Sequence, residues 1–212
     1  RELPVLKDHG AARMDFAGRP DPLTRYVADF PRRRVVVLGD AILDEYLLGD
    51  CSRISPEAPV PVLRVRTDKQ ELGGAANTAS NIVSLGGHAS LIALVGSDST
   101  GLTLKRRAAD AGVDLMAVDH GRATLRKTRV IGQHQQIVRL DYEEVVPPDS
   151  RLEAEILALF NSAVDGCDVV VISDYAKGFL SLTLSQTLLQ RAHGAGKRVI
   201  VDPRPQHSPF YV

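Results

Sequence analysis

The sequence predicts an α/β fold built on a mostly parallel sheet. Short apolar runs that suit strands alternate with longer segments whose apolar residues recur at helical spacing. The run Val169-Val170-Val171-Ile172 is apolar at every position, which is typical of a strand buried on both faces. Because this alternation implies right-handed strand–helix–strand crossovers, we expect helices to cover both faces of the sheet.

The elements of this fold follow one another from Arg34 onward. Strands are expected at Val35–Leu38, Ala89–Val95, Val113–Val118, Asp168–Ser173 and Arg198–Asp202. Helices are expected at Ala75–Leu85, Thr100–Ala111, Ser150–Val164 and Ser181–His193. A capping box of Ser150 and Glu153 would begin the third helix. Glycine stands where three helices should stop, at Gly86, Gly112 and Gly194.

Residues 1–31 differ from the rest and are predicted to be an N-terminal extension of a domain at 32–212. They contain four prolines and little periodicity, with a short helix expected around Leu23–Phe30. Two later segments, at about 52–70 and 124–142, lack a helical stripe and contain β-type residues. The prolines of the first suit an edge strand, where a missing N–H breaks no ladder bond. We expect these two segments to form a small β-lid over one edge of the sheet.

Composition excludes several classes of partner. Lys plus Arg and Asp plus Glu number 26 each, so no net charge favours nucleic acid or an anionic membrane. Cys51 and Cys167 are too few for a disulfide framework and lack metal-ligand spacing. No apolar run approaches the roughly 18–20 residues that span a bilayer, and the N-terminus has no apolar signal core. The sequence therefore predicts a cytoplasmic protein without nucleic-acid or membrane partners.

Two aspartates, Asp40 and Asp44, follow the first strand. Ligands of parallel sheets collect beyond the carboxyl ends of the strands. A carboxylate there can accept hydrogen bonds from neighbouring sugar hydroxyls. The alternative interpretation is an exposed loop acid or a helix cap. A classical dinucleotide fold is disfavoured, since Gly-x-Gly-x-x-Gly is absent from this turn.

The stretch Gly73-Gly74-Ala75-Ala76-Asn77 is a glycine turn that opens into a helix. Two glycines allow backbone to approach a ligand without a Cβ clash, and a helix start presents free N–H groups. Asn77 would offer an amide to a hydroxyl. These features predict a site for a polar ligand, although a purely structural turn is the alternative.

Cationic residues form two further groups. Arg126, Lys127 and Arg129, with Arg139 beyond them, lie on the second lid segment, and Lys127 and Arg129 would share one strand face. Guanidinium groups offer paired donors to phosphate, although solvated edge-strand charges are the alternative. Lys177 in Ser173-Asp-Tyr-Ala-Lys-Gly178 and Arg204 in Asp202-Pro-Arg204 follow the last two strands. No histidine has ligand spacing, so no metal site is predicted.

Together with Ser52–Val62, these motifs resemble the ribokinase-family sugar kinases, and within them the branch that phosphorylates D-glycero-D-manno-heptose 7-phosphate. The second lid segment has the Lys-x-Arg-Val pattern of that branch at Lys127–Val130, and a matching continuation, Gln135-Gln-Ile-Val-Arg-Leu-Asp141. The resemblance covers roughly residues 34–205. It implies a ribokinase-like fold whose lid covers the sugar and often forms a homodimer contact, and it implies use of ATP and Mg²⁺.

The resemblance also implies roles for individual residues. Asp44 stands where the family places a sugar-binding aspartate, and Gly73, Gly74, Asn77 and Asp40 would join it. Lys127 and Arg129 would hold the distal phosphate, and Lys177 and Arg204 would lie near the transferring phosphoryl group. The expected reaction transfers the γ-phosphate of ATP to O1 of the heptose. Its product, the 1,7-bisphosphate, leads towards ADP-heptose for the lipopolysaccharide core.

The expected catalytic aspartate is missing from the sequence. The family carries this base in a Gly-Ala-Gly-Asp motif beyond the fifth strand, and no Gly-x-Gly-Asp follows residue 178. No catalytic residue is therefore predicted within this chain, and the base is expected beyond Val212. The sequence is interpreted as the N-terminal part of a longer kinase, inactive by itself. The alternatives are another ribokinase-type carbohydrate or nucleoside kinase, a non-catalytic sugar-phosphate binding module, or a nucleotide-binding oxidoreductase fragment.

Overall fold

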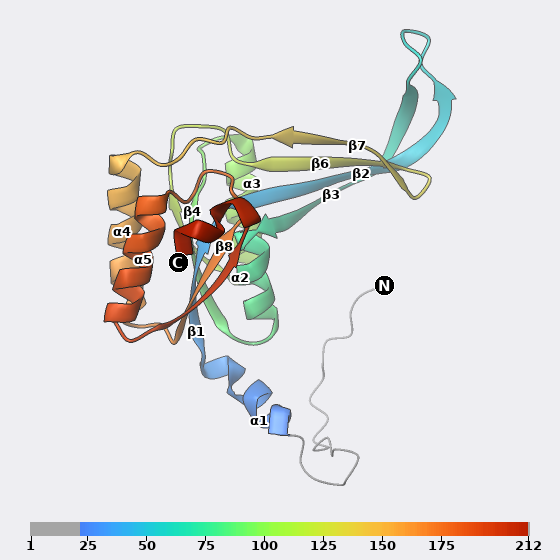
Figure 1. Cartoon of the computed structure of the whole chain (residues 1–212). Helices are drawn as coiled ribbons and strands as arrows, with labels where there is room; N and C mark the ends of the chain where they lie inside the picture. The colour runs from blue at the N-terminus through green and yellow to red at the C-terminus, as the bar shows by residue number, and fades with distance from the viewer. Residues whose placement is uncertain (1–21, 212) are drawn as a thin grey trace.

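The described part of the chain contains a five-stranded parallel sheet, helices that cover it, and a four-stranded second sheet (Figure 1). The computed structural model describes residues 22–211. The main sheet has the order β5-β4-β1-β8-β9, and every neighbouring pair is parallel. Its strands are β1 Arg34–Gly39, β4 His88–Leu94, β5 Asp114–Val118, β8 Val169–Asp174 and β9 Arg198–Pro203. The predicted fold class is confirmed, and each predicted strand is present with ends within one residue of those expected.

Helices cover both faces of the main sheet, as the alternating pattern predicts. On one face lie α2 Ala75–Ser84 and α3 Ser99–Asp110, and on the other α4 Ser150–Val164 and α5 Leu182–Gly194. The face under α4 and α5 packs large side chains such as Phe160, which is fully buried. The face under α2 is rich in alanine, with Ala75, Ala76, Ala79, Ala89 and Ala93 all buried. Burial of each large apolar side chain stabilises the fold by about 1.5–3 kcal/mol.

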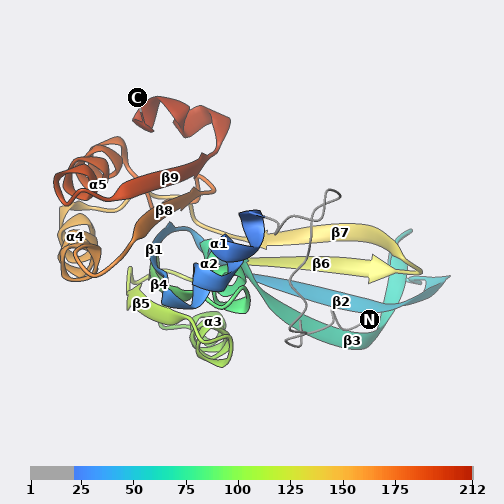
Figure 2. The ribbon, with the colours of Figure 1, turned by 90° about the horizontal axis from the view of Figure 1, so that it is seen from below.

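The second sheet, here called the lid, projects sideways from the carboxyl end of the main sheet (Figure 2). It has the order β3-β2-β6-β7, with β2 and β6 parallel and the outer pairs antiparallel. Its strands are β2 Ala41–Ile54, β3 Pro61–Gly74, β6 Arg126–Gly132 and β7 Gln135–Tyr142. The lid is longer than predicted, because β2 begins one residue after Asp40 and continues directly from β1.

The second lid segment folds into a tight hairpin. Gln133 and His134 connect β6 to β7 with positive φ angles of 48° and 71°. Two successive positive φ angles are typical of a type I′ turn, whose twist matches that of the flanking strands. The predicted segment 124–142 therefore contains two strands of the lid.

The predicted capping box at the start of α4 is wrong. The N-cap is Asp149, whose carboxylate accepts a hydrogen bond from the Leu152 backbone N–H at 2.8 Å. Glu153 instead accepts from the Ser181 hydroxyl at the start of α5. An aspartate one residue earlier is as strong a cap as serine, and this frees Glu153 to join the two helices.

The two ends of the described chain are short helical segments. Helix α1 spans Pro22–Asp29, where a helix was predicted, and is followed by a 3-10 turn at Phe30–Arg32. A further 3-10 segment, Pro205–Tyr211, follows β9. The remainder of the predicted extension lies outside the described residues. So does Val212.

Candidate functional site

A cavity of about 540 Å³ opens where the lid meets the carboxyl ends of the main strands. It is lined by residues of β2, β3, β6, β7, the start of α2, and the segments after β8 and β9. These are Ile42, Asp44, Tyr46, Glu71, Leu72, Gly73, Gly74, Asn77, Lys127, Arg129, Arg139, Tyr175, Lys177 and Arg204. The structure thus brings eight of the nine predicted site residues around one cavity, at the end of the sheet where ligands of this architecture bind.

Strand register places the charged lid residues side by side. Across β2 and β6, Asp44 is opposite Lys127 and Tyr46 is opposite Arg129. Across β6 and β7, Arg129 is opposite Arg139. Because side chains two residues apart share a strand face, these groups form a continuous polar face towards the cavity. The lid thus presents charged side chains to the cavity at the carboxyl end of the main sheet.

The side chain of Asp44, on β2, lies between Gly73 of β3 and Arg129 of β6. Its Oδ1 accepts a hydrogen bond from Arg129 Nη1 at 2.5 Å, and its side chain is about one-fifth exposed. A Cβ on Gly73 would lie 2.4 Å from Asp44 Oδ2, so only glycine leaves this carboxylate its present position. The interpretation of Asp44 as a loop acid or a helix cap does not hold, since it lies within a strand and faces the cavity.

Gly74 closes the junction between β3 and α2. It adopts φ +56° and ψ −136°, a combination open essentially only to glycine. The N–H of Ala75 donates to the Asp40 carbonyl at 2.9 Å, which ties the start of α2 to the end of β1. Asn77 lies in the first turn of α2, is exposed and lines the cavity.

Two lysines reach the cavity from different sheets. Lys127 of β6 donates to Asp141 Oδ2 and to Glu143 Oε2, both at 2.9 Å. Lys177, in the loop after β8, donates to Glu143 Oε1 at 2.6 Å. Partial burial raises the pKa of Glu143, but hydrogen bonds from the two ammonium groups outweigh it and hold that pKa below its ordinary value. Glu143 therefore stays ionised between the two lysines at neutral pH.

Asp141 lies at the far end of the same network. Arg139 donates two hydrogen bonds to it, at 2.8 and 3.0 Å. The Arg139 guanidinium, with the Lys127 ammonium, lowers the pKa of Asp141 to about 2. Arg204 lies over the Tyr175 ring at 5.2 Å and makes no ion pair within the described part of the chain.

Asp40 does not join the other predicted residues. Its side chain is 3% exposed, and it accepts backbone N–H bonds from Tyr175, Lys177 and Phe179 at 2.9–3.0 Å. Burial raises the pKa of Asp40, although these N–H donors oppose the shift. Since both oxygens are engaged by the loop after β8, this carboxylate positions Lys177.

Sequence reasoning missed several members of the site. Tyr46, Glu71 and Tyr175 line the cavity, and Glu143 joins its two lysines. Alternation along β2 was the available signal for Tyr46, because it lies two residues beyond Asp44. Glu143 follows the end of β7, and nothing in the sequence indicates that it reaches both Lys127 and Lys177.

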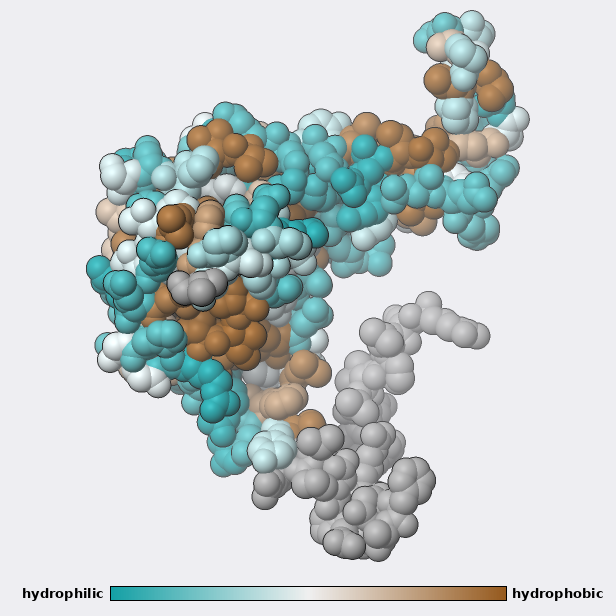
Figure 3. All heavy atoms as spheres, viewed as in Figure 1, coloured by the Kyte–Doolittle hydropathy of each residue, from teal (hydrophilic) through white to brown (hydrophobic). Residues whose placement is uncertain are grey.

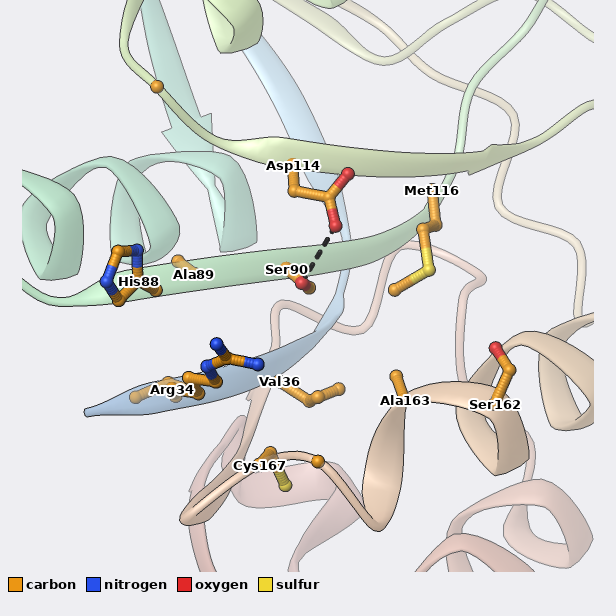
Figure 4. A pocket seen from close by; sticks show the side chains of 13 residues that line it. Arg34, Val36, His88, Ala89, Ser90, Asp114, Met116, Ser162, Ala163 and Cys167 are labelled. Atoms are coloured by element: carbon orange, nitrogen blue, oxygen red, sulfur yellow. Dashed lines mark hydrogen bonds between the residues drawn. The ribbon is translucent and has the colours of Figure 1, made fainter. Parts of the chain in front are cut away.

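A second cavity, of about 490 Å³, lies at the amino ends of β1, β4 and β5 (Figure 4). Its wall includes Arg34, His88 and Cys167, and a hydrogen bond of 2.9 Å from the Ser90 hydroxyl to Asp114. None of the predicted site residues lines it. The chemical groups of the candidate site therefore gather at the opposite end of the sheet.

Known proteins resemble this chain in sequence and in fold. The sequence model of the pfkB family of carbohydrate kinases matches residues 32–210. The chain belongs to the pfkB carbohydrate kinase family. Its resemblance to ribokinase-type sugar kinases is thereby confirmed. Among curated relatives, the bifunctional protein HldE of Caulobacter vibrioides is 43% identical over 193 residues, which cover 90% of this chain and 39% of that protein.

Other similarities agree with this assignment. HldE of Mesorhizobium japonicum is 40% identical over 187 residues, or 87% of this chain and 38% of that protein. This kinase-family chain thus spans less than two-fifths of the length of these relatives. The phosphofructokinase-2 of Escherichia coli with substrates and products superposes with a TM-score of 0.67 at 23% identity, over 84% of this chain and 56% of that one. The latter likeness shows the fold.

Two features are absent from residues 22–211. No helix in this range is long and apolar enough to cross a membrane. Nor do three or more histidine, cysteine, aspartate or glutamate side chains of the same range gather as a metal ligand set.

Proposed function

We propose that the protein containing this chain transfers the γ-phosphate of ATP to O1 of D-glycero-D-manno-heptose 7-phosphate, giving the 1,7-bisphosphate. The chain would bind the acceptor sugar. The observation that carries the proposal is the set of five cationic side chains that line one cavity beside a carboxylate and a glycine turn. The cations are Lys127, Arg129, Arg139, Lys177 and Arg204.

Charge in the cavity suits a phosphorylated sugar. The lining acids are Asp44 and Glu71, and two further carboxylates, Asp141 and Glu143, pair with lining cations. Five lining cations against these four carboxylates leave a small excess of positive charge, which favours an anionic ligand, and arginine offers the paired donors that phosphate accepts. Asp44 and Asn77 add the acceptors and donors that sugar hydroxyls require. The HldE relatives and the family motifs support a heptose over other sugars.

The chain's own residues would bind and orient the acceptor. Asp44 would accept hydrogen bonds from two hydroxyls, and Lys127 and Arg129 would hold the 7-phosphate. Lys177 and Arg204 would stabilise charge on the phosphoryl group as it moves.

Neither a catalytic base nor a Mg²⁺ site is assigned to the described residues. The base that removes the proton from O1 would lie beyond Val212, as the sequence predicts. ATP and Mg²⁺ would likewise bind largely outside the described part of the chain. The reaction would take place in the cytoplasm as a step towards ADP-heptose.

The lid would also provide a homodimer contact. Large apolar side chains of the lid are 40–64% exposed, and hydrophobic residues, in brown, lie along it in Figure 3. These are Ile54, Val65, Ile137, Val138 and Leu140. Sedimentation equilibrium of the wild-type chain and of the double variant Ile137→Ser, Leu140→Ser tests this, since the variant should shift towards monomer.

A substrate panel tests the proposed reaction. ADP release by the full-length protein is expected with heptose 7-phosphate and not with the unphosphorylated heptose, ribose, adenosine or fructose 6-phosphate. Turnover of another acceptor in place of heptose 7-phosphate would assign the site to that sugar. Absence of turnover with tight sugar-phosphate binding would make it a binding module.

Two substitutions test the site itself. Asp44→Asn should weaken use of the sugar by about 2–4 kcal/mol, because charged hydrogen bonds are lost. Lys127→Ala should weaken binding of heptose 7-phosphate far more than that of the unphosphorylated heptose, as measured by calorimetry. Unchanged sugar affinity in folded Asp44→Asn, or equal losses for the two ligands in Lys127→Ala, would remove that residue from its assigned role.

A further inference from the structure

One carboxylate outside the cavity joins its two lysines. Glu143 is the first residue after β7, and its two oxygens accept from different ammonium groups, Lys127 at 2.9 Å and Lys177 at 2.6 Å. The three side chains are only 13–23% exposed. This partial burial reduces screening by solvent, so the contacts are stronger than those of a surface ion pair.

Glu143 bridges the two sheets of the molecule. Lys127 belongs to β6 of the lid, whereas Lys177 lies in the loop after β8 of the main sheet. The backbone on either side is fixed: Asp40 holds the loop through three N–H bonds. The segment beyond Glu143 touches the same loop, since a Cβ on Gly178 would come within 2.8 Å of the Val146 carbonyl oxygen. Glu143 therefore lies between the lid and a loop after β8 whose backbone is held in place.

The lysines keep donors free for a ligand. Each ammonium group has three N–H donors. Among the contacts of the described residues, Lys127 uses two, to Asp141 and Glu143, and Lys177 uses one. Both lysines line the cavity and Glu143 does not, so the carboxylate contacts the lysines without itself forming part of the cavity wall. One donor of Lys127 and two of Lys177 remain.

We propose that Glu143 is a positioning residue that sets the spacing of Lys127 and Lys177, so that both act on one bound sugar phosphate. This inference rests on the proposed function, which assigns Lys127 to the phosphate the sugar carries and Lys177 to the phosphoryl group in transfer. Two ammonium groups that share a carboxylate would repel each other without it. Each lysine contacts a different oxygen of Glu143, so a glutamine in the same position would accept from one lysine and turn its NH₂ group towards the other.

The first test measures positioning in this chain without substrate. In ¹H–¹⁵N spectra of the lysine side chains, ammonium signals of Lys127 and Lys177 should be protected from solvent exchange. Glu143→Gln should abolish the protection of at least one of them, and Asp141→Asn should affect Lys127 alone, because Asp141 does not touch Lys177. Glu144→Gln, the same change at the exposed neighbouring residue, should leave both signals unchanged. Protection of both signals in Glu143→Gln would overturn the proposal.

The second test measures the consequence in the full-length protein. Glu143→Gln should lower kcat for heptose 7-phosphate by about 10-fold, because Lys177 no longer lies where charge develops on the phosphoryl group. Asp141→Asn should change KM with little change in kcat, and Glu144→Gln should match wild type. A kcat within about twofold of wild type in Glu143→Gln would overturn the proposal. Absence of turnover by the wild type would refute the proposed function instead, and the spectra would then decide the role of Glu143.

Discussion

The main sheet and the lid are stabilised by different interactions. The last four residues of β1 are buried, and apolar clusters cover both faces of the main sheet. All eight residues of β7 in the lid are exposed. The lid is held by its strand ladder and by ion pairs such as Arg129–Asp44 and Lys127–Glu143. The main sheet is thus stabilised chiefly by apolar burial, and the lid chiefly by strand pairing and ion pairs.

This difference explains where the site residues come from. A buried parallel sheet leaves few polar groups free except at the carboxyl ends of its strands. The lid can place a charge at every second position of a strand, because its face is open to the cavity. Charged lid side chains therefore serve both to hold the lid and to line the site.

Replacing one large side chain in each region tests this contrast most strongly. Phe160→Ala, in the fully buried cluster under α4, should lower the free energy of unfolding by about 4 kcal/mol. Leu140→Ala, at a lid position 40% exposed in the single chain, should lower it by about 0.5 kcal/mol when the monomer is measured. Urea denaturation followed by circular dichroism measures both. Equal losses would show that the lid is packed as tightly as the core.

The junction between the two regions should be nearly as sensitive. Gly74→Ala would place a Cβ 2.2 Å from the Asp40 carbonyl oxygen at a backbone conformation that alanine avoids. We expect a loss of about 3 kcal/mol in the free energy of unfolding. Gly194→Ala, where a Cβ meets nothing within 4 Å, is the matched control and should be neutral. A Gly74→Ala variant as stable as this control would contradict the strained junction.

Acid should weaken the lid before the core. Because hydrogen bonds from Arg139 and Lys127 lower the pKa of Asp141 from 3.8 to about 2, its stabilisation is complete above pH 3.8. The stabilisation is lost as the pH falls through about 2. Its size is about 1 kcal/mol, reduced by solvent because the carboxylate is one-quarter exposed.

The measurement compares the wild type with Asp141→Asn by urea denaturation at a series of pH values. Their difference in unfolding free energy should be about 1 kcal/mol at about pH 6 and should shrink towards about pH 2. A difference that does not depend on pH would show that the lid does not use this carboxylate.

The main sheet could be predicted closely from the sequence because burial on both faces leaves a continuous apolar run. Val169–Ile172 is such a run, and the predicted strand there differs from β8 by one residue at each end. The start of the lid is harder to predict from the sequence, since Ala41–Asp50 mixes apolar and acidic residues and no turn separates this segment from β1. Its extension was therefore predicted from Ser52 onward, where prolines mark the edge.

The site residues that belong to local sequence motifs could be predicted, whereas those brought together by strand register could not. Asp44, Gly73 and Lys127 follow from local patterns, and the structure gathers them around one cavity. Asp40 has the same local signal as Asp44 but turns its carboxylate into the loop after β8. The reach of Glu143 to two lysines depends on pairing between segments far apart in sequence, which no local pattern reveals.

The central claim is that the lid and the main sheet form one binding site for a phosphorylated sugar. Titration of the ¹⁵N-labelled chain with D-glycero-D-manno-heptose 7-phosphate tests it most directly. We predict saturable shifts of backbone amides on both sides of the cavity, at Asp44 and Arg129 in the lid and at Asn77 and Lys177 in the main domain. Shifts confined to one of the two sheets, or centred on the cavity beside Arg34 and His88, would contradict it.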